Sequence, residues 1–137
     1  FTGAGAKAVM EESNRELLVM IQIESRTGAD NADAIMATPG IDAVLIGPND
    51  LSVSLGLPGQ VKHPKVREHI DKVIDACAKH HKYFGTFVGS IEDAEYYLEK
   101  GARLLVYSAE VYMLSKQASE SMAALDALRG RLSETVL

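Results

Sequence analysis

The chain has 137 residues, of which 47% are apolar and 24% are charged, and its formal net charge is −5. This composition is typical of a globular domain with one hydrophobic core, and residues 1–137 are expected to form a single domain. The acidic balance argues against a nucleic-acid partner, and charged residues interrupt every apolar stretch, so no membrane span is expected. The single cysteine, Cys77, excludes an internal disulfide and favours a reducing, cytoplasmic compartment.

Strand-like and helix-like patterns alternate along the chain. Continuous apolar runs, which predict strands, occupy residues 17–23, 43–46, 83–88 and 104–107. Helical patterns follow them at residues 29–37, 64–82, 90–100 and from 110 onward. Continuous rather than alternating apolarity predicts parallel strands that are buried on both faces.

Local signals mark the ends of the predicted helices. Pro64 suits the first position of a helix, where its missing N–H costs nothing. Ser90 is a typical N-cap with Asp93 three residues later, and Gly101 closes that helix. The last helix carries an apolar seam at three- and four-residue spacing, formed by Val111, Leu114, Ala118, Met122, Leu125 and Leu128.

The resulting order of four strand–helix units indicates an α/β fold. Such a chain can form an open, doubly wound sheet, or it can form half of an eight-stranded (β/α)₈ barrel. The pattern alone leaves both open. Because the chain begins at Phe1 rather than at a methionine, we expect it to be part of a longer protein.

Two acidic residues follow neighbouring predicted strands. Glu24 comes after the first strand and Asp50 after the second. Ligands bind at the carboxyl ends of parallel strands, where these carboxylates would converge on a hard cation such as Mg²⁺ or Mn²⁺. The alternative is that each acid faces water or that Asp50 caps a short helical turn through Leu51 to Leu55.

A polar residue interrupts the first strand. Gln22 stands two positions before Glu24, so both side chains project from the same side of that strand. It either lines the cavity of Glu24 or is a core glutamine satisfied by backbone groups. After the second strand, the backbone N–H groups of Asn49 and Asp50 near a helical turn form a cradle for a carboxylate.

These motifs are similar to those of a known family. Residues 22–25 (Gln-Ile-Glu-Ser), 39–52 (ending Gly-Pro-Asn-Asp-Leu-Ser) and 54–56 (Ser-Leu-Gly) together resemble the HpcH/HpaI aldolase family. Members are metal-dependent pyruvate aldolases that act on 2-keto-3-deoxy sugar acids and 4-hydroxy-2-oxo acids. The resemblance implies a (β/α)₈ barrel of the TIM type, of which this chain covers about the second half.

The resemblance also implies roles for individual residues. Glu24 and Asp50 match the metal ligands, for Mg²⁺ or Mn²⁺ with Co²⁺ as a third candidate. Gln22 matches a residue that contacts pyruvate, and the N–H groups of Asn49 and Asp50 match the cradle for its carboxylate. The substrates would be pyruvate with a small aldehyde or keto acid. The catalytic arginine and histidine of the family come from the first half of the barrel, so catalytic residues of this chain are unknown.

The resemblance implies a carbon–carbon lyase, and two alternatives remain open. One is an acyl-CoA lyase of the citrate-lyase β type, which shares the fold and the carboxylate pair. The other is a non-catalytic half barrel that lacks the groups of the first half. The unpaired edge strands of a half barrel predict association into a homo-oligomer. The last helix is expected to pack on a neighbouring subunit or on its own barrel, and His63, His69, His80 and His81 to face solvent.

Overall fold

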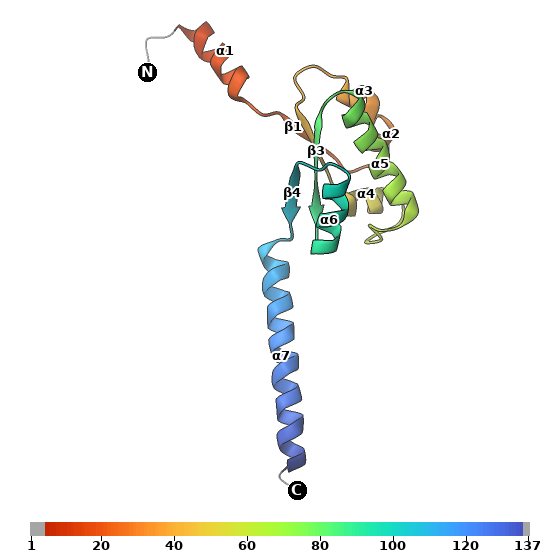
Figure 1. Cartoon of the computed structure of the whole chain (residues 1–137), viewed down its shortest axis with the longest axis vertical. Helices are drawn as coiled ribbons and strands as arrows, with labels where there is room; N and C mark the ends of the chain where they lie inside the picture. The colour runs from red at the N-terminus through yellow and green to blue at the C-terminus, as the bar shows by residue number, and fades with distance from the viewer. Residues whose placement is uncertain (1–4, 136–137) are drawn as a thin grey trace. The chain divides into compact units, whose positions relative to one another are not determined.

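The computed structural model describes residues 5–135, which divide into two compact units, residues 5–106 and 107–135. Figure 1 labels the elements of both units. The first unit contains the sheet and the helices around it, in the order α1 (Ala6–Glu16), β1 (Met20–Ile23), α2 (Arg26–Asp30), α3 (Ala32–Met36), β2 (Ala43–Ile46), α4 (Pro48–Ser54), α5 (Pro64–Lys79), β3 (Tyr83–Val88) and α6 (Ile91–Glu99). Strand β4 (Leu104–Tyr107) reaches the boundary, and helix α7 (Glu110–Thr135) belongs to the second unit.

The sheet has four strands in the order β1-β2-β3-β4, and the pairs β1–β2 and β2–β3 are parallel. The four predicted strands are therefore confirmed. Strand β1 begins at Met20 rather than at residue 17, because helix α1, which the sequence did not predict, is capped at Leu17. Pairing starts where Asp42 Oδ2 accepts a hydrogen bond from the Val19 N–H at 2.8 Å.

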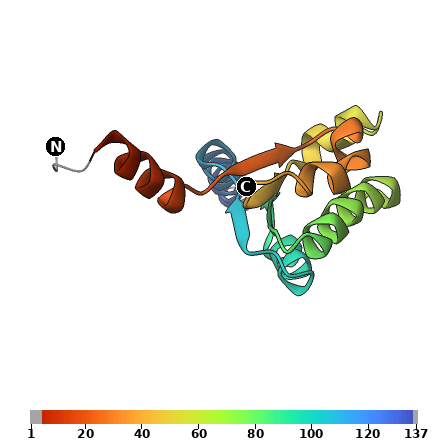
Figure 2. The ribbon, with the colours of Figure 1, turned by 90° about the horizontal axis from the view of Figure 1, so that it is seen from above.

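The two faces of the sheet differ in their cover. Strand alternation places Ile23, Ile46 and Thr86 on the face beneath the helices, where all three are buried. Helices α5 and α6 pack on this face, and Figure 2 shows them on one side of the sheet. On the other face Phe87 is 41% exposed. The expectation that both faces are covered is wrong for this chain, because in a barrel the inner face is covered only when the sheet closes.

Helix α5 supplies most of the helical side of the core. Val66, Ile70, Val73 and Cys77 are buried along the predicted stripe. Pro64 occupies the first turn as predicted, and His63 Nδ1 caps the helix by accepting from the Lys65 N–H at 3.1 Å. The helix ends at Lys79, three residues before the predicted 82, because His81 adopts a left-handed backbone with φ 54°.

Two further helical predictions have different outcomes. The single helix expected at residues 29–37 is two short helices, α2 and α3, which meet at Asn31. Asn31 itself accounts for the break, because its Nδ2 donates to the Thr27 carbonyl at 2.8 Å and caps α2 locally. The N-cap of α6 is confirmed, since Ser90 Oγ accepts from the Asp93 N–H at 3.2 Å, and Gly101 follows with φ 93°.

The histidines do not all face solvent. His69 is buried, because its side of α5 packs against α2. Its Nδ1 lies 2.7 Å from the Lys65 carbonyl oxygen and its Nε2 lies 3.6 Å from Asp30 Oδ1. The solvent-facing prediction is therefore wrong for His69. His63 and His80 are only partly exposed, whereas His81 is exposed.

An ion-pair cluster joins α3 to the end of α5. Asp33 accepts from Lys79 Nζ at 2.7 Å and lies 2.8 Å from His80 Nε2. These two hydrogen bonds, first that of Lys79, lower the pKa of the Asp33 carboxyl. The cluster holds two helices of the outer layer together and lies on helices rather than at the strand ends that carry Glu24 and Asp50.

Helix α7 forms the second unit. Its seam residues Val111, Leu114, Met122, Leu125 and Leu128 are exposed. Packing of this seam on a neighbouring subunit or on its own barrel stays a prediction. Between residues 5 and 135, no helix combines the length and the apolarity that crossing a bilayer requires.

The buried thiol of Cys77 provides a probe of unfolding. Burial raises its pKa to about 11, and its Sγ lies 3.6 Å from Met36 Sδ. Since the thiolate is the reactive form, we expect labelling by a disulfide reagent at pH 8 to be at least about 100-fold slower than for a free thiol. Urea should restore the rate of a free thiol. Fast labelling without denaturant would show that this part of the core opens readily.

Candidate functional site

The candidate site begins where β1 and β2 end at the same edge of the sheet. Ile23 is paired with Ile46, so Glu24 and Gly47 are the next residues of the two strands. The Gly47 N–H donates to the Ile23 carbonyl at 3.0 Å and extends the ladder by one bond. The chain then turns into helix α4, which carries Asp50.

Gln22 and Glu24 project from the same side of β1, as predicted. Gln22 Nε2 donates to Glu24 Oε2 at 2.6 Å. Gln22 is exposed and Glu24 is partly buried. The alternative of a core glutamine satisfied by backbone groups is therefore wrong, because the partner of this amide is the carboxylate.

Gly47 lies against this pair. A Cβ built on Gly47 would stand 2.7 Å from Glu24 Cβ, 3.0 Å from Glu24 Oε2 and 3.3 Å from Gln22 Nε2. The absence of a side chain at Gly47 is thus what lets the end of β1 approach the start of α4. The sequence showed a glycine here, but the contact depends on the strand register.

Helix α4 presents a free first turn at the same edge. It begins at Pro48 with Gly47 as its N-cap, so Asp50 is not the N-cap of a turn through Leu55. Gly47 has no side chain to cap the helix, and the first bond runs from the Leu51 N–H to the Gly47 carbonyl. The N–H groups of Asn49 and Asp50 therefore have no acceptor within the helix, and both residues are exposed.

The rest of the Asp-Leu-Ser stretch anchors this helix. Leu51 is fully buried in the core. Ser52 Oγ donates to the Asn49 carbonyl at 2.6 Å and accepts from the Gly59 N–H at 3.0 Å. Ser54 Oγ accepts from the Arg26 N–H at 2.9 Å and so joins the segment after β1 to α4. Sequence reasoning quoted these residues as a motif but did not assign these structural roles.

The donor set of this edge suits a hard cation. Within residues 5–135 there is no cluster of three or more histidine, cysteine, aspartate or glutamate residues that could hold a metal. Glu24 and Asp50 follow adjacent strands and offer carboxylate oxygens, which Mg²⁺ and Mn²⁺ prefer. Mg²⁺ commonly takes one or two carboxylates and completes its shell with water and substrate oxygens. These residues fit such an ion, and their joint binding of one ion stays a prediction.

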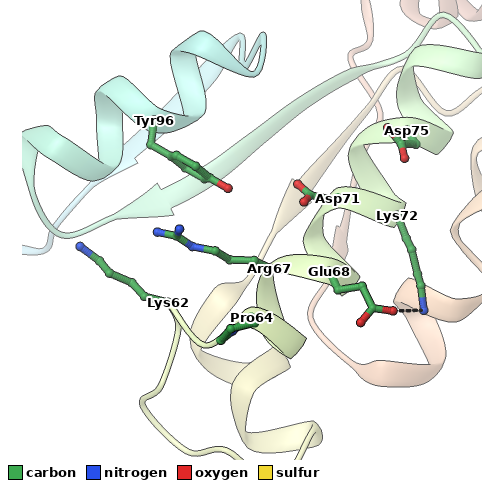
Figure 3. Close-up of a pocket in the computed structure, with 8 residues that line it drawn as sticks. All are labelled: Lys62, Pro64, Arg67, Glu68, Asp71, Lys72, Asp75 and Tyr96. Atoms are coloured by element: carbon green, nitrogen blue, oxygen red, sulfur yellow. Dashed lines mark ion pairs between the residues drawn. The ribbon is translucent and has the colours of Figure 1, made fainter.

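A groove lies between α5 and α6. Figure 3 shows that Arg67 and Asp71 of α5 and Tyr96 of α6 line it together with Lys62, Pro64, Glu68, Lys72 and Asp75. The Arg67 guanidinium lies 4.5 Å from the centre of the Tyr96 ring, and Asp71 binds Lys100 at 2.7 Å. Lys72 also pairs with Glu68 at 3.6 Å, and the contact between Arg67 and Tyr96 joins α5 to α6 across the groove.

Comparison with known proteins decides the family. The sequence profile of the HpcH/HpaI aldolase/citrate lyase family matches residues 3–115, which include both strand ends and the start of α4. The chain belongs to the HpcH/HpaI aldolase/citrate lyase family. Members of this family resemble the chain in sequence and in structure.

Two curated relatives are aldolases. The chain is 37% identical over 112 residues to the 5-keto-4-deoxy-D-glucarate aldolase of Klebsiella pneumoniae, covering 82% of this chain and 43% of that protein. It is 36% identical over 114 residues to the hydroxypyruvate/pyruvate aldolase of Chromohalobacter salexigens, covering 83% of this chain and 45% of that protein. The chain thus spans less than half the length of these relatives.

A solved structure also matches the chain over about half of its own length. The HpcH/HpaI aldolase from Desulfitobacterium hafniense superimposes with a TM-score of 0.82 at 32% sequence identity, over 91% of this chain and 49% of that chain. The order of the sheet and this match confirm an α/β chain of the TIM-barrel type that covers about half a barrel. The open doubly wound sheet is therefore not the architecture of this chain.

Proposed function

We propose that this chain supplies the metal- and pyruvate-binding half of a lyase active site. The reaction is retro-aldol cleavage of a 2-keto-3-deoxy sugar acid or a 4-hydroxy-2-oxo acid to pyruvate and a small aldehyde. The curated relatives that are named as aldolases support this class of reaction. The arrangement at the ends of β1 and β2 supports the location of the site.

The observation that carries the proposal is the edge formed by Gln22, Glu24 and the first turn of α4. Here a carboxylate bound by an amide at 2.6 Å follows β1, and a second carboxylate and two helix N–H groups follow β2. A 2-oxo acid has a carboxylate and a neighbouring carbonyl oxygen. The edge thus combines carboxylates for a cation with an anion-binding helix start.

Each residue has a distinct part in this proposal. Glu24 and Asp50 hold the divalent cation, Mg²⁺ or Mn²⁺ with Co²⁺ as the third candidate, which when bound supplies Lewis-acid polarisation of a carbonyl. The N–H groups of Asn49 and Asp50 bind the carboxylate of pyruvate and fix its orientation. Gln22 lies beside Glu24 and contacts pyruvate through the part of its amide that Glu24 does not use.

Proton transfer belongs to residues outside this chain in the proposal. The described histidines lie on α5 or directly beside it, and His69 is buried there against Asp30. Because the matched segment covers only 43% and 45% of the two relatives, the remaining half of a barrel would bring the acid–base and aldehyde-binding groups. A second copy of the chain in a homo-oligomer is the other way to cover the sheet.

The proposal is tested by titrating pyruvate into the protein by calorimetry, once with saturating Mg²⁺ and once after chelation of metal. Pyruvate should bind with Mg²⁺ and lose at least about ten-fold in affinity without it, as one lost charge-assisted contact already implies. Binding that is indifferent to metal, or absent in both titrations, would contradict the proposal. Preference for an acyl-CoA thioester over pyruvate would instead indicate the citrate-lyase β type of chemistry.

A further inference from the structure

Gly47 lies close against Glu24 and Gln22 of the candidate site. A Cβ at this position would lie 2.7 Å from Glu24 Cβ, which is closer than real side chains come. Glu24 Cβ is attached directly to the backbone of the chain, so it cannot rotate away like the tip of a long side chain. A larger residue at Gly47 must therefore separate the end of β1 from the start of α4.

This separation changes the geometry between the two carboxylates. Glu24 follows β1, whereas Asp50 lies in the first turn of α4, three residues after Gly47. The hydrogen bond from the Gly47 N–H to the Ile23 carbonyl at 3.0 Å fixes the two segments at this distance. The absence of a side chain at Gly47 thus sets the distance between the segment that carries Glu24 and the segment that carries Asp50.

Gln22 restricts the Glu24 carboxylate in a second way. Its Nε2 donates to Glu24 Oε2 at 2.6 Å, and the same Oε2 lies 3.0 Å from the Gly47 Cβ position. One oxygen of Glu24 is thereby held between an amide and a glycine. The Gln22 hydrogen bond goes to Oε2, so the other oxygen, Oε1, is the one left to bind a cation.

We infer that Gly47 and Gln22 are positioning residues for Glu24, which together hold its carboxylate in one orientation beside α4. This inference rests on the proposed function, since it assigns a task to two residues of the same metal site. It goes beyond the expected contact of Gln22 with pyruvate, because it predicts an effect on metal binding when no pyruvate is present.

The test measures the dissociation constant for Mn²⁺ alone, by electron paramagnetic resonance of the free ion. Gly47→Ala adds the side chain that the site excludes, and Gln22→Met removes the amide at nearly constant length. Gly89→Ala is the matched control, because Gly89 follows β3 and has nothing within 4 Å of its Cβ position. Gly85→Ala is a control for folding, since its Cβ would meet Leu104 Cβ and the Leu104 carbonyl oxygen at 2.8 Å.

Gly47→Ala and Gln22→Met should each weaken Mn²⁺ binding about ten-fold or more, as loss of residues that orient a metal ligand does. The double variant should lose less than the product of the two effects, because both act on one carboxylate. Gly89→Ala should stay within about two-fold of the unchanged protein. Gly85→Ala should lower the melting temperature without changing the affinity of the folded protein.

The outcomes separate this inference from the proposed function. If the unchanged protein does not bind Mn²⁺, or Glu24→Ala binds it equally well, both the function and the inference fail. If Glu24→Ala loses binding while Gly47→Ala or Gln22→Met keeps it, the inference is overturned and the function stands. Should Gly47→Ala not fold, Gln22→Met decides alone, because Gln22 is exposed and its substitution leaves the core intact.

Discussion

Replacement of Glu24 by alanine should weaken binding of Mn²⁺ or Mg²⁺ by more than about 100-fold, beyond what loss of an outer-shell partner causes. Glu24 and Asp50 are the two carboxylates that follow β1 and β2, and the Gln22 amide, whose Nε2 donates to Glu24, adds no negative charge. Loss of either acid removes a negative charge and an oxygen ligand at once. Asp50→Ala should have an effect of the same order.

Two companion variants sharpen this prediction. Glu24→Gln keeps the shape of the side chain but removes its charge, and it should also lose most of the affinity. Glu99→Ala removes an exposed carboxylate at the far end of α6 and should bind the metal like the unchanged protein. Isothermal titration with MnCl₂ measures all of these, and unchanged affinity in both Glu24→Ala and Asp50→Ala would remove the site.

Leu51→Ala should destabilise the protein by about 2–5 kcal/mol, the usual cost of emptying a fully buried leucine site. Leu51 is fully buried and anchors α4, the helix that carries the carboxylate cradle. The motif residue that follows Asp50 therefore acts through packing. Leu51→Ala should lower the urea concentration at the midpoint of unfolding. It should not change the slope of the unfolding free energy against urea concentration.

The neighbouring residue provides the control for this prediction. Val53 lies on the same helix and is 60% exposed, so Val53→Ala should change the free energy of unfolding by less than about 0.5 kcal/mol. Equal effects of Leu51→Ala and Val53→Ala would show that α4 is not anchored in the core through Leu51. The start of α4 would then not be held against the end of β1 in this way.

The sequence predicted those parts of the fold in which apolar side chains follow a regular pattern and are buried in the core. The strands at residues 43–46 and 83–88 and the stripe of α5 are buried in this way, and the structure confirms them. The strand at residues 104–107 is also confirmed, although none of its residues is fully buried. Helix α1 was missed because all of its described side chains are exposed, so it has no buried stripe. The break at Asn31 depends on one local side-chain bond, which periodicity does not contain.

In the candidate site, too, local patterns predicted some features, whereas features that depend on contacts between distant segments were missed. That Gln22 and Glu24 share one side follows from strand alternation, and the structure confirms it by their hydrogen bond. That Gly47 lies against this pair depends on the register of β1 and β2, which no local pattern reveals. The burial of His69 likewise depends on how α2 packs against α5.

The most direct test of the central claim is a crystal structure with Mn²⁺, read from its anomalous scattering. We predict a single strong Mn²⁺ peak at the ends of β1 and β2, with oxygen ligands from both Glu24 and Asp50. A peak bound elsewhere, or one bound by neither carboxylate, would contradict the claim that these two acids form one metal site.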